Sequence, residues 1–155
     1  MKIIKNKPEY IDQLVVLVEE YREFCGFNSS PEETKFFFSN LQKNNEAITF
    51  IAVDERTDTV MGFVNLYPSY STLSLRRLWI LNDLGVAKAF QGYGVAKALI
   101  KKVLSFAEST GAVRIELKTE KSNATARKLY QSLGFKADDE HIYYRVPVES
   151  YDRTY

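Results

Sequence analysis

The 155-residue sequence is poor in several kinds of residue, and each shortage excludes a class of protein. It has one cysteine, Cys25, which excludes an internal disulfide and a cysteine-based zinc site and fits a reducing compartment. Its 21 basic and 20 acidic side chains nearly cancel, which argues against a broad nucleic-acid surface. No apolar run is long enough to span a membrane, and residues 1–8 lack the apolar stretch of a secretion signal. We therefore expect a cytoplasmic protein without nucleic-acid or membrane partners.

The residues that are present are typical of one globular domain. Hydrophobic residues make up 45% and charged residues 26% of the chain, and the length suits one substantial core. No repeat, low-complexity stretch or linker interrupts it. We expect one domain over residues 1–148 and a loosely ordered tail over residues 149–155.

Hydrophobic periodicity predicts strands and helices in the order β-α-α-β-β-β-α-β-α-β-β. The predicted strands are residues 2–5, 47–53, 60–67, 75–86, 114–119, 135–136 and 142–146. The predicted helices begin near Pro8, near Ser30, near Tyr93 and at Ser122 or Asn123. Strands and helices in this order bury their apolar sides most simply in a layered arrangement. The sequence therefore predicts an α/β (α+β) fold with a central, mixed, twisted sheet of about seven strands and helices on both faces.

The second predicted helix carries two local signals. Ser30 and Glu33 have the spacing of a capping box, in which each side chain bonds the other's backbone amide. Phe36, Phe37, Phe38 and Leu41 supply the predicted apolar side of this helix.

A glycine-containing stretch after the strand at residues 75–86 predicts a phosphate-binding turn. Residues 91–96 read Q-G-Y-G-V-A, which has the spacing [Q/R]-x-x-G-x-[G/A]. Glycines allow a tight turn, and the first amides of the next helix point together at an anion. An ordinary helix start is the alternative explanation. A dinucleotide fingerprint begun at Gly92 is excluded because Lys97 stands where its last glycine belongs, and no P-loop string occurs.

Residues 123–135 form a second motif, N-A-T-A-R-K-L-Y-Q-S-L-G-F. The two motifs, in this order and spacing, resemble those of the GNAT superfamily of acetyl-CoA-dependent N-acetyltransferases. The resemblance covers roughly residues 75–146, and the first half matches only in its element pattern. It implies a GNAT-like domain over residues 1–148 that uses acetyl-CoA and no metal.

The resemblance implies that the cofactor lies between the strand ending at Val86 and the strand at residues 114–119. Backbone groups at Leu84 and Val86 would pair with the pantetheine arm, and the amides of residues 92–97 would bind the diphosphate. Lys97 and Lys101 would face the outer phosphates or simply remain solvated. The implied cofactor-binding residues are Leu84, Gly85, Val86, Gln91, Gly92, Tyr93, Gly94, Val95, Ala96, Lys97, Thr119, Asn123, Ala126 and Tyr130.

The resemblance also implies that Tyr130 is the general acid for the leaving thiolate. An unperturbed phenol has a pKa near 10 and so carries its proton at pH 7. Packing in the core is the alternative use of this tyrosine. Asn123 is expected to hydrogen-bond the cofactor arm, although helix capping explains it equally well.

The general base is less clear from the sequence. At two positions where some family members carry a catalytic acid or histidine, this chain has Ile80 and Asn82, which cannot take a proton. Asp83 is the nearest carboxylate, although strict alternation puts it on the opposite face from Asn82 unless a bulge intervenes. It is either the base or a structural hydrogen-bond partner of the neighbouring strand or loop. Glu116 and Glu120 are weaker candidates.

Aromatic residues lie where the family places its acceptor pocket. Tyr21, Phe24 and Phe27 flank the loop between the first two helices, and Tyr67 and Tyr70 lie at the turn before the long strand. An aromatic wall would suit a cationic or apolar amine, and core packing or a dimer contact is the alternative.

Other residues near these elements have ordinary explanations. Glu19, Glu20 and Glu23 either attract a cationic amine or form a solvated helix face. Cys25 is expected to be a small packed hydrophobe, and His141 to lie at the surface in an acidic run.

The resemblance favours an enzyme that transfers an acetyl group to a primary amine by direct attack in a ternary complex. The amine would be a small molecule such as a polyamine, or an amine on a protein or peptide. An acetyl-CoA sensor without turnover is the alternative, supported by Ile80 and Asn82, and a purely structural domain is a third. A homodimer is among the expectations.

Overall fold

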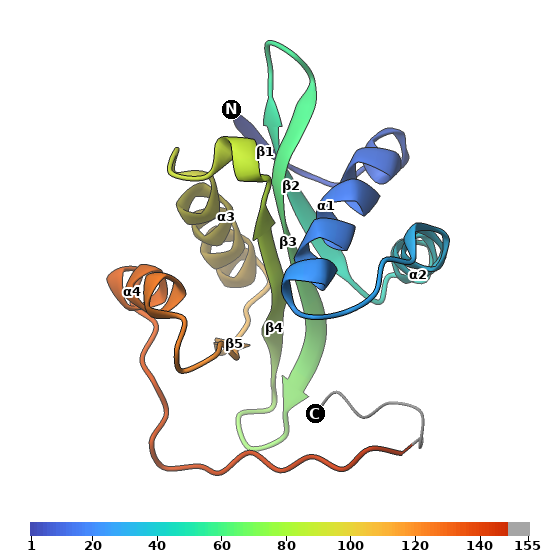
Figure 1. Ribbon diagram of the computed structural model, residues 1–155. Coiled ribbons are helices and arrows are strands. Elements are labelled where there is room, and N and C mark those ends of the chain that lie inside the picture. Colours follow the sequence, from blue (N-terminus) through green and yellow to red (C-terminus); the bar gives the residue numbers. More distant parts are fainter. Residues whose placement is uncertain (149–155) are drawn as a thin grey trace. The chain divides into compact units, whose positions relative to one another are not determined.

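The computed structural model describes residues 1–148 (Figure 1). Its elements are β1 (Lys2–Lys5), the 3₁₀ helix η1 (Pro8–Tyr10), α1 (Ile11–Phe24), α2 (Pro31–Lys43), β2 (Ile48–Asp54), β3 (Thr59–Ser71), β4 (Arg76–Val86), η2 (Lys88–Phe90), α3 (Val95–Ser109), β5 (Ile115–Leu117) and α4 (Ala124–Ser132). Contacts group the chain into two compact units, residues 1–120 and the residues from Lys121 onward. The tail predicted at residues 149–155 lies outside the described residues.

One mixed sheet organises the first unit. Its strand order is β1-β2-β3-β4-β5, with antiparallel neighbours except for the parallel pair β4 and β5. The interior strand β2 reads I-T-F-I-A-V-D and is buried along most of its length, which a strand covered on both faces requires.

The sheet has five strands within residues 1–148, so the prediction of about seven was too high. The expected strands at residues 135–136 and 142–146 do not form. Ile142, Tyr144 and Val146 are exposed instead of packed. A β-strand forms only when its backbone hydrogen-bonds to a neighbouring strand. An alternating hydrophobic pattern does not show whether such a neighbour is present.

Helices cover both faces of the sheet within residues 1–120, as predicted (Figure 1). On one face, Leu14 and Val18 of α1 pack with Ile51 and Phe63 of the sheet in a buried cluster. On the other, the ring of Phe106 in α3 contacts those of Phe50 and Trp79, at centroid distances of 5.3 and 5.1 Å. These two packed layers hold β4 and its end in place.

The start of α2 is capped by a distant residue, and the predicted capping box is wrong. Ser30 makes no side-chain cap. The buried carboxylate of Glu19 in α1 accepts hydrogen bonds from the Ser30 amide (2.5 Å), the Thr34 hydroxyl (2.5 Å), the Ser29 hydroxyl (2.7 Å) and the Arg22 guanidinium (3.0 Å). Burial alone would raise the pKa of Glu19, but these donors lower it to about 2.

The apolar side predicted for α2 is also narrower than expected. Phe38 is buried, whereas Phe36 and Phe37 are exposed. Consecutive helical residues point about 100° apart, so three in a row cannot all face one core.

Candidate active site

The chain bends sharply between β4 and α3. Gly92 and Gly94 have φ angles of 84° and 78°, in the left-handed region that favours glycine. Gly94 is the N-cap of α3, and the helix begins at Val95, two residues later than predicted. A left-handed residue cannot continue a right-handed helix, so Gly94 sets this boundary.

The bend leaves backbone donors without acceptors. The first bond into the helix runs from the Ala98 amide to the Gly94 carbonyl at 3.0 Å. Within residues 1–148, the amides of Val95, Ala96 and Lys97 therefore have no hydrogen-bond acceptor, and no side chain caps them. The loop itself is exposed, including Gln91, and α3 is 15 residues long. Such a helix start can bind an anion.

The end of β4 has an unpaired edge beside this bend. β5 pairs only with Trp79–Leu81 of β4, so within the described chain no strand lies beyond Leu84 and Val86 on that side. The Ala87 amide bonds the Met61 carbonyl of β3 at 2.8 Å. Backbone groups alternate in direction along an antiparallel ladder, so those of Leu84 and Val86 point away from β3.

Two other predicted site residues have local contacts. The side-chain Nε2 of Gln91 donates a hydrogen bond to the Val86 carbonyl at 3.3 Å. Gly85 has room for no larger residue, because a Cβ there would lie 2.7 Å from Cε1 of Phe63. Gly85 is thus fixed by packing against β3.

A bulge in β4 determines where Asp83 points. Asp83 pairs with Asn65 and Leu81 with Leu66, so Asn82 is an extra residue. This irregularity reverses the alternation and places Asp83 on the face of Asn65, next to α1. The bulge considered in the sequence analysis is therefore present.

Asp83 sits among hydrogen-bond donors. Its Oδ2 accepts from Nδ2 of Asn65 and from Nδ2 of Asn82, both at 3.1 Å. The predicted bond to a neighbouring strand is thus confirmed. The phenol of Tyr21 lies near this carboxylate, and burial together with the nearby negative charge raises the pKa of Tyr21. Burial and the charge of Asp83 raise the pKa of Tyr67 to about 12.

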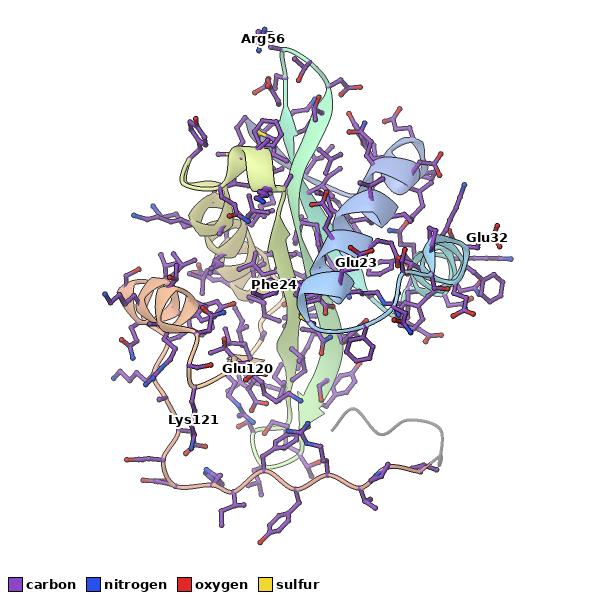
Figure 2. The ribbon with its side chains drawn as sticks, viewed as in Figure 1. Glu23, Phe24, Glu32, Arg56, Glu120 and Lys121 are labelled. Carbon is purple, nitrogen blue, oxygen red and sulfur yellow. The ribbon has the colours of Figure 1, made fainter. Side chains whose placement is uncertain are left out.

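The weaker base candidates lie elsewhere. Glu116 is exposed and bonds Arg114 at 2.7 Å. Glu120 is exposed at the end of the first unit (Figure 2), and its charge acts on the thiol of Cys25. Cys25 is itself exposed, so the prediction of a packed residue is wrong.

The predicted aromatic wall divides into two groups. Tyr21 and Tyr67 are half-buried beside Asp83. Phe24 is 84% and Tyr70 68% exposed, and Figure 2 shows Phe24 at the C-terminal end of α1. Phe27 lies under the guanidinium of Arg22, at 5.8 Å.

The acidic residues of α1 also differ from one another. Glu20 and Glu23 are exposed, as a solvated face requires. Glu19 is neither solvated nor available to an amine, because its carboxylate is fully engaged at the start of α2.

Within the second unit, α4 carries the predicted acid. Asn123 caps the helix, since its Oδ1 accepts the Ala126 amide at 3.1 Å. The Tyr130 ring packs edge-on to Phe135 at 5.7 Å, and burial raises the pKa of its phenol. The phenol is therefore protonated at neutral pH. His141 is exposed and contacts Asp138 at 2.6 Å, as a surface residue would.

The described residues offer neither a metal-binding cluster nor a membrane-spanning helix. Residues 1–148 hold no group of three or more His, Cys, Asp or Glu side chains placed to bind a metal ion. Among their helices, none combines the length and the apolar character needed to cross a membrane.

Comparison with known proteins agrees with this geometry. The profile of the Acetyltransferase (GNAT) family matches residues 14–135. The chain belongs to the GNAT acetyltransferase family. It is 31% identical to the "Uncharacterized N-acetyltransferase YhfO" of Bacillus subtilis (strain 168), over 96% of this chain and 98% of that one. It is 35% identical to a "Probable acetyltransferase" of Haemophilus influenzae, over 88% and 90%. A crystal structure titled "probable acetyltransferase" superposes with a TM-score of 0.91 at 38% identity, covering 96% of this chain and 99% of that one.

This GNAT acetyltransferase is therefore an acyltransferase enzyme with the α/β architecture of its family. The family uses acetyl-CoA as its acetyl donor. The free amides after Gly94 and the unpaired edge at Leu84 and Val86 are the features of this chain that such a donor fits.

The sequence analysis missed Asn65 and Thr49 of the acetyltransferase. Both are buried, and the Thr49 hydroxyl donates to Oδ1 of Asn65 at 2.8 Å. Asn65 could have been noticed in the sequence, because it is the one side-chain amide in the otherwise apolar run V-M-G-F-V-N-L at residues 60–66.

Proposed function

We propose that this acetyltransferase moves an acetyl group from acetyl-CoA to a primary amine by direct attack within a ternary complex. The observation that supports this most strongly is the bend at Gly92 and Gly94, which presents the free amides of α3 beside an unpaired edge of β4. The N–H groups at the bend can donate hydrogen bonds to a diphosphate. The backbone at the edge of β4 can form strand-like hydrogen bonds with the amides of the pantetheine arm.

Residues of both motifs would hold the donor. The amides of Gly92–Lys97 would bind the diphosphate, and the backbone of Leu84 and Val86 would bond the pantetheine arm. Acetyl-CoA supplies a thioester, whose carbonyl carbon a neutral amine can attack. The other proposed contacts are Gly85, Gln91, Thr119, Asn123, Ala126 and Tyr130.

Asp83 is the proposed general base. A lysine-like amine with a pKa of about 10.4 is neutral in only about one molecule in a few thousand at pH 7, so its ammonium must lose a proton. The carboxylate of Asp83 would accept that proton. Its position supports this use, because it lies beside two half-buried phenols and pairs with no cation among residues 1–148.

Tyr130 is the proposed general acid. Its phenol keeps its proton at neutral pH because burial raises its pKa. Tyr130 would give that proton from Oη to the leaving sulfur.

The proposed acceptor is a cationic amine, either a small molecule such as a polyamine or an amine on a protein or peptide. The phenols of Tyr21 and Tyr67 and the carboxylate of Asp83 itself support a cation here. We also propose a cytoplasmic location. We further propose a homodimer, whose mass sedimentation velocity would test.

Thermal unfolding and turnover test the proposal together. Acetyl-CoA at one hundred times its Kd should stabilise the protein by about 2.7 kcal/mol. Thiol release should then follow with at least one amine from a panel of polyamines, amino acids, aminoglycosides and peptides. Stabilisation without turnover would favour the alternative of an acetyl-CoA sensor. No stabilisation by acetyl-CoA or coenzyme A would contradict both.

A further inference from the structure

Three polar side chains form a row across the face of the sheet that α1 covers. Thr49 of β2 pairs in register with Asn65 of β3, and Asn65 pairs with Asp83 of β4. The Thr49 hydroxyl donates to Oδ1 of Asn65 at 2.8 Å, and Nδ2 of Asn65 donates to Oδ2 of Asp83 at 3.1 Å. The row runs from the interior of the sheet to the carboxylate at its bulge.

Asn65 occupies an unusual place for an amide. It is 0% exposed and Thr49 is 2% exposed, and the strand around Asn65 is apolar. A buried amide is tolerated only when its donors and acceptors are paired. The amide orientation is also determined, because an ionised carboxylate only accepts hydrogen bonds and so requires the NH₂ side of Asn65.

The surroundings leave the charge of Asp83 unbalanced. The groups that face it are the phenols of Tyr21 and Tyr67 and the amide of Asn82. The charge of Asp83 also acts on the thiol of Cys25, as does that of Glu120. None of these groups is a cation, and the donors that bond the carboxylate are the side-chain amides of Asn65 and Asn82.

We propose that Asn65, held by Thr49, is a positioning residue that fixes the carboxylate of Asp83 toward the acceptor amine. This inference rests on the proposed function, in which Asp83 takes the proton of the ammonium. The amide of Asn65 restricts rotation of the carboxylate, and the hydroxyl of Thr49 restricts rotation of the amide. Asn65 itself is buried and touches no substrate.

A double-mutant cycle tests this inference. Asn65→Leu should lower kcat by about 10- to 100-fold, the equivalent of one lost hydrogen bond to a charged group, with the Kd of acetyl-CoA unchanged. In an Asp83→Asn background, the same substitution should cause no further loss, because Asn65 acts through Asp83. Thr49→Val, which keeps the side-chain shape, should lower kcat less. If Asn65→Leu does not fold, Thr49→Val takes its place in the same double-mutant cycle.

Ile51→Ala is the matched control, because it removes a fully buried side chain on the same face without touching the row. Below its unfolding temperature it should keep the wild-type kcat. Equal losses in both backgrounds, or an Asn65→Leu enzyme as fast as the wild type, would overturn the inference and leave the proposed function intact. A wild-type protein that acetylates no primary amine would overturn the proposed function and this inference with it.

Discussion

At the scale of single residues, Glu19 connects the first two helices. Its carboxylate is 7% exposed and accepts from two hydroxyls, one amide and one guanidinium on both sides of the connection between α1 and α2. Hydrogen bonds to a charged group contribute about 1.5–3 kcal/mol each, so this one side chain stabilises the whole connection.

Glu19→Gln should lower the free energy of unfolding by about 2–3 kcal/mol at pH 7, because an amide puts a donor where the site needs an acceptor. The folded-state pKa of Glu19 is depressed from 4.5 to about 2. Its contribution is therefore complete above pH 4.5 and is lost as pH falls toward 2, so the gap between wild type and variant should narrow over that window.

Urea unfolding at several pH values measures that gap. Glu20→Gln is the control, because Glu20 is the exposed neighbour in the same helix and should leave stability nearly unchanged. A gap that is the same at pH 7 and pH 3 would show that the charge of Glu19 does not matter.

Tyr130 gives the second prediction at this scale. Tyr130→Phe keeps the ring that packs against Phe135 but removes the proton donor, so it should lower kcat by about 100-fold or more and leave the Kd of acetyl-CoA unchanged. Steady-state thiol release and calorimetric titration measure the two constants. Tyr144→Phe, at an exposed position, should do neither. Equal turnover by the Tyr130 and Tyr144 variants would remove Tyr130 from the mechanism.

At the scale of elements, the proposed functional positions lie where regular structure is interrupted. The bulge at Asn82 turns Asp83 toward α1, and the bend at Gly94 starts α3. At each interruption a single residue changes the local backbone geometry. The bulge brings Asp83 beside Asn65, and the bend brings the free amides of α3 together.

Gly94→Ala tests the bend. Nothing lies within 4 Å of an added Cβ, so the cost comes only from the left-handed backbone, about 1–2 kcal/mol. If that conformation binds acetyl-CoA, the Kd should rise about 5- to 30-fold. Gly94→Asn should raise it less, because asparagine tolerates this conformation better.

Gly111→Ala is the matched control for this loss. Gly111 has a φ of 70°, also has open space around it, and follows the other end of α3. It should lose similar stability and keep the wild-type Kd in the same calorimetric titration. An equal loss of affinity in both variants would contradict a binding function for the bend.

The elements also show which features a sequence can predict. The helix periodicity and the glycine turn depend on neighbouring residues, so the four predicted helices form and the cap at Asn123 is confirmed. The cap at Glu19 joins residues 15 apart at Thr34, and the row at Asn65 joins three strands. Such contacts depend on the register of distant elements, which local patterns do not contain.

At the scale of the whole molecule, the positive and negative side chains nearly balance. The net charge is +1 for 155 residues, so there is no strong overall field to attract an anionic cofactor. In the proposed function, local features take that role, namely the amides after Gly94 and the edge of β4.

A crystal structure of the protein with acetyl-CoA tests that claim most directly. The account predicts diphosphate oxygens within about 3 Å of the amide nitrogens between Gly92 and Lys97, and the pantetheine arm paired with Leu84 and Val86. A diphosphate bound elsewhere, with these amides turned to solvent or covered by side chains, would contradict it.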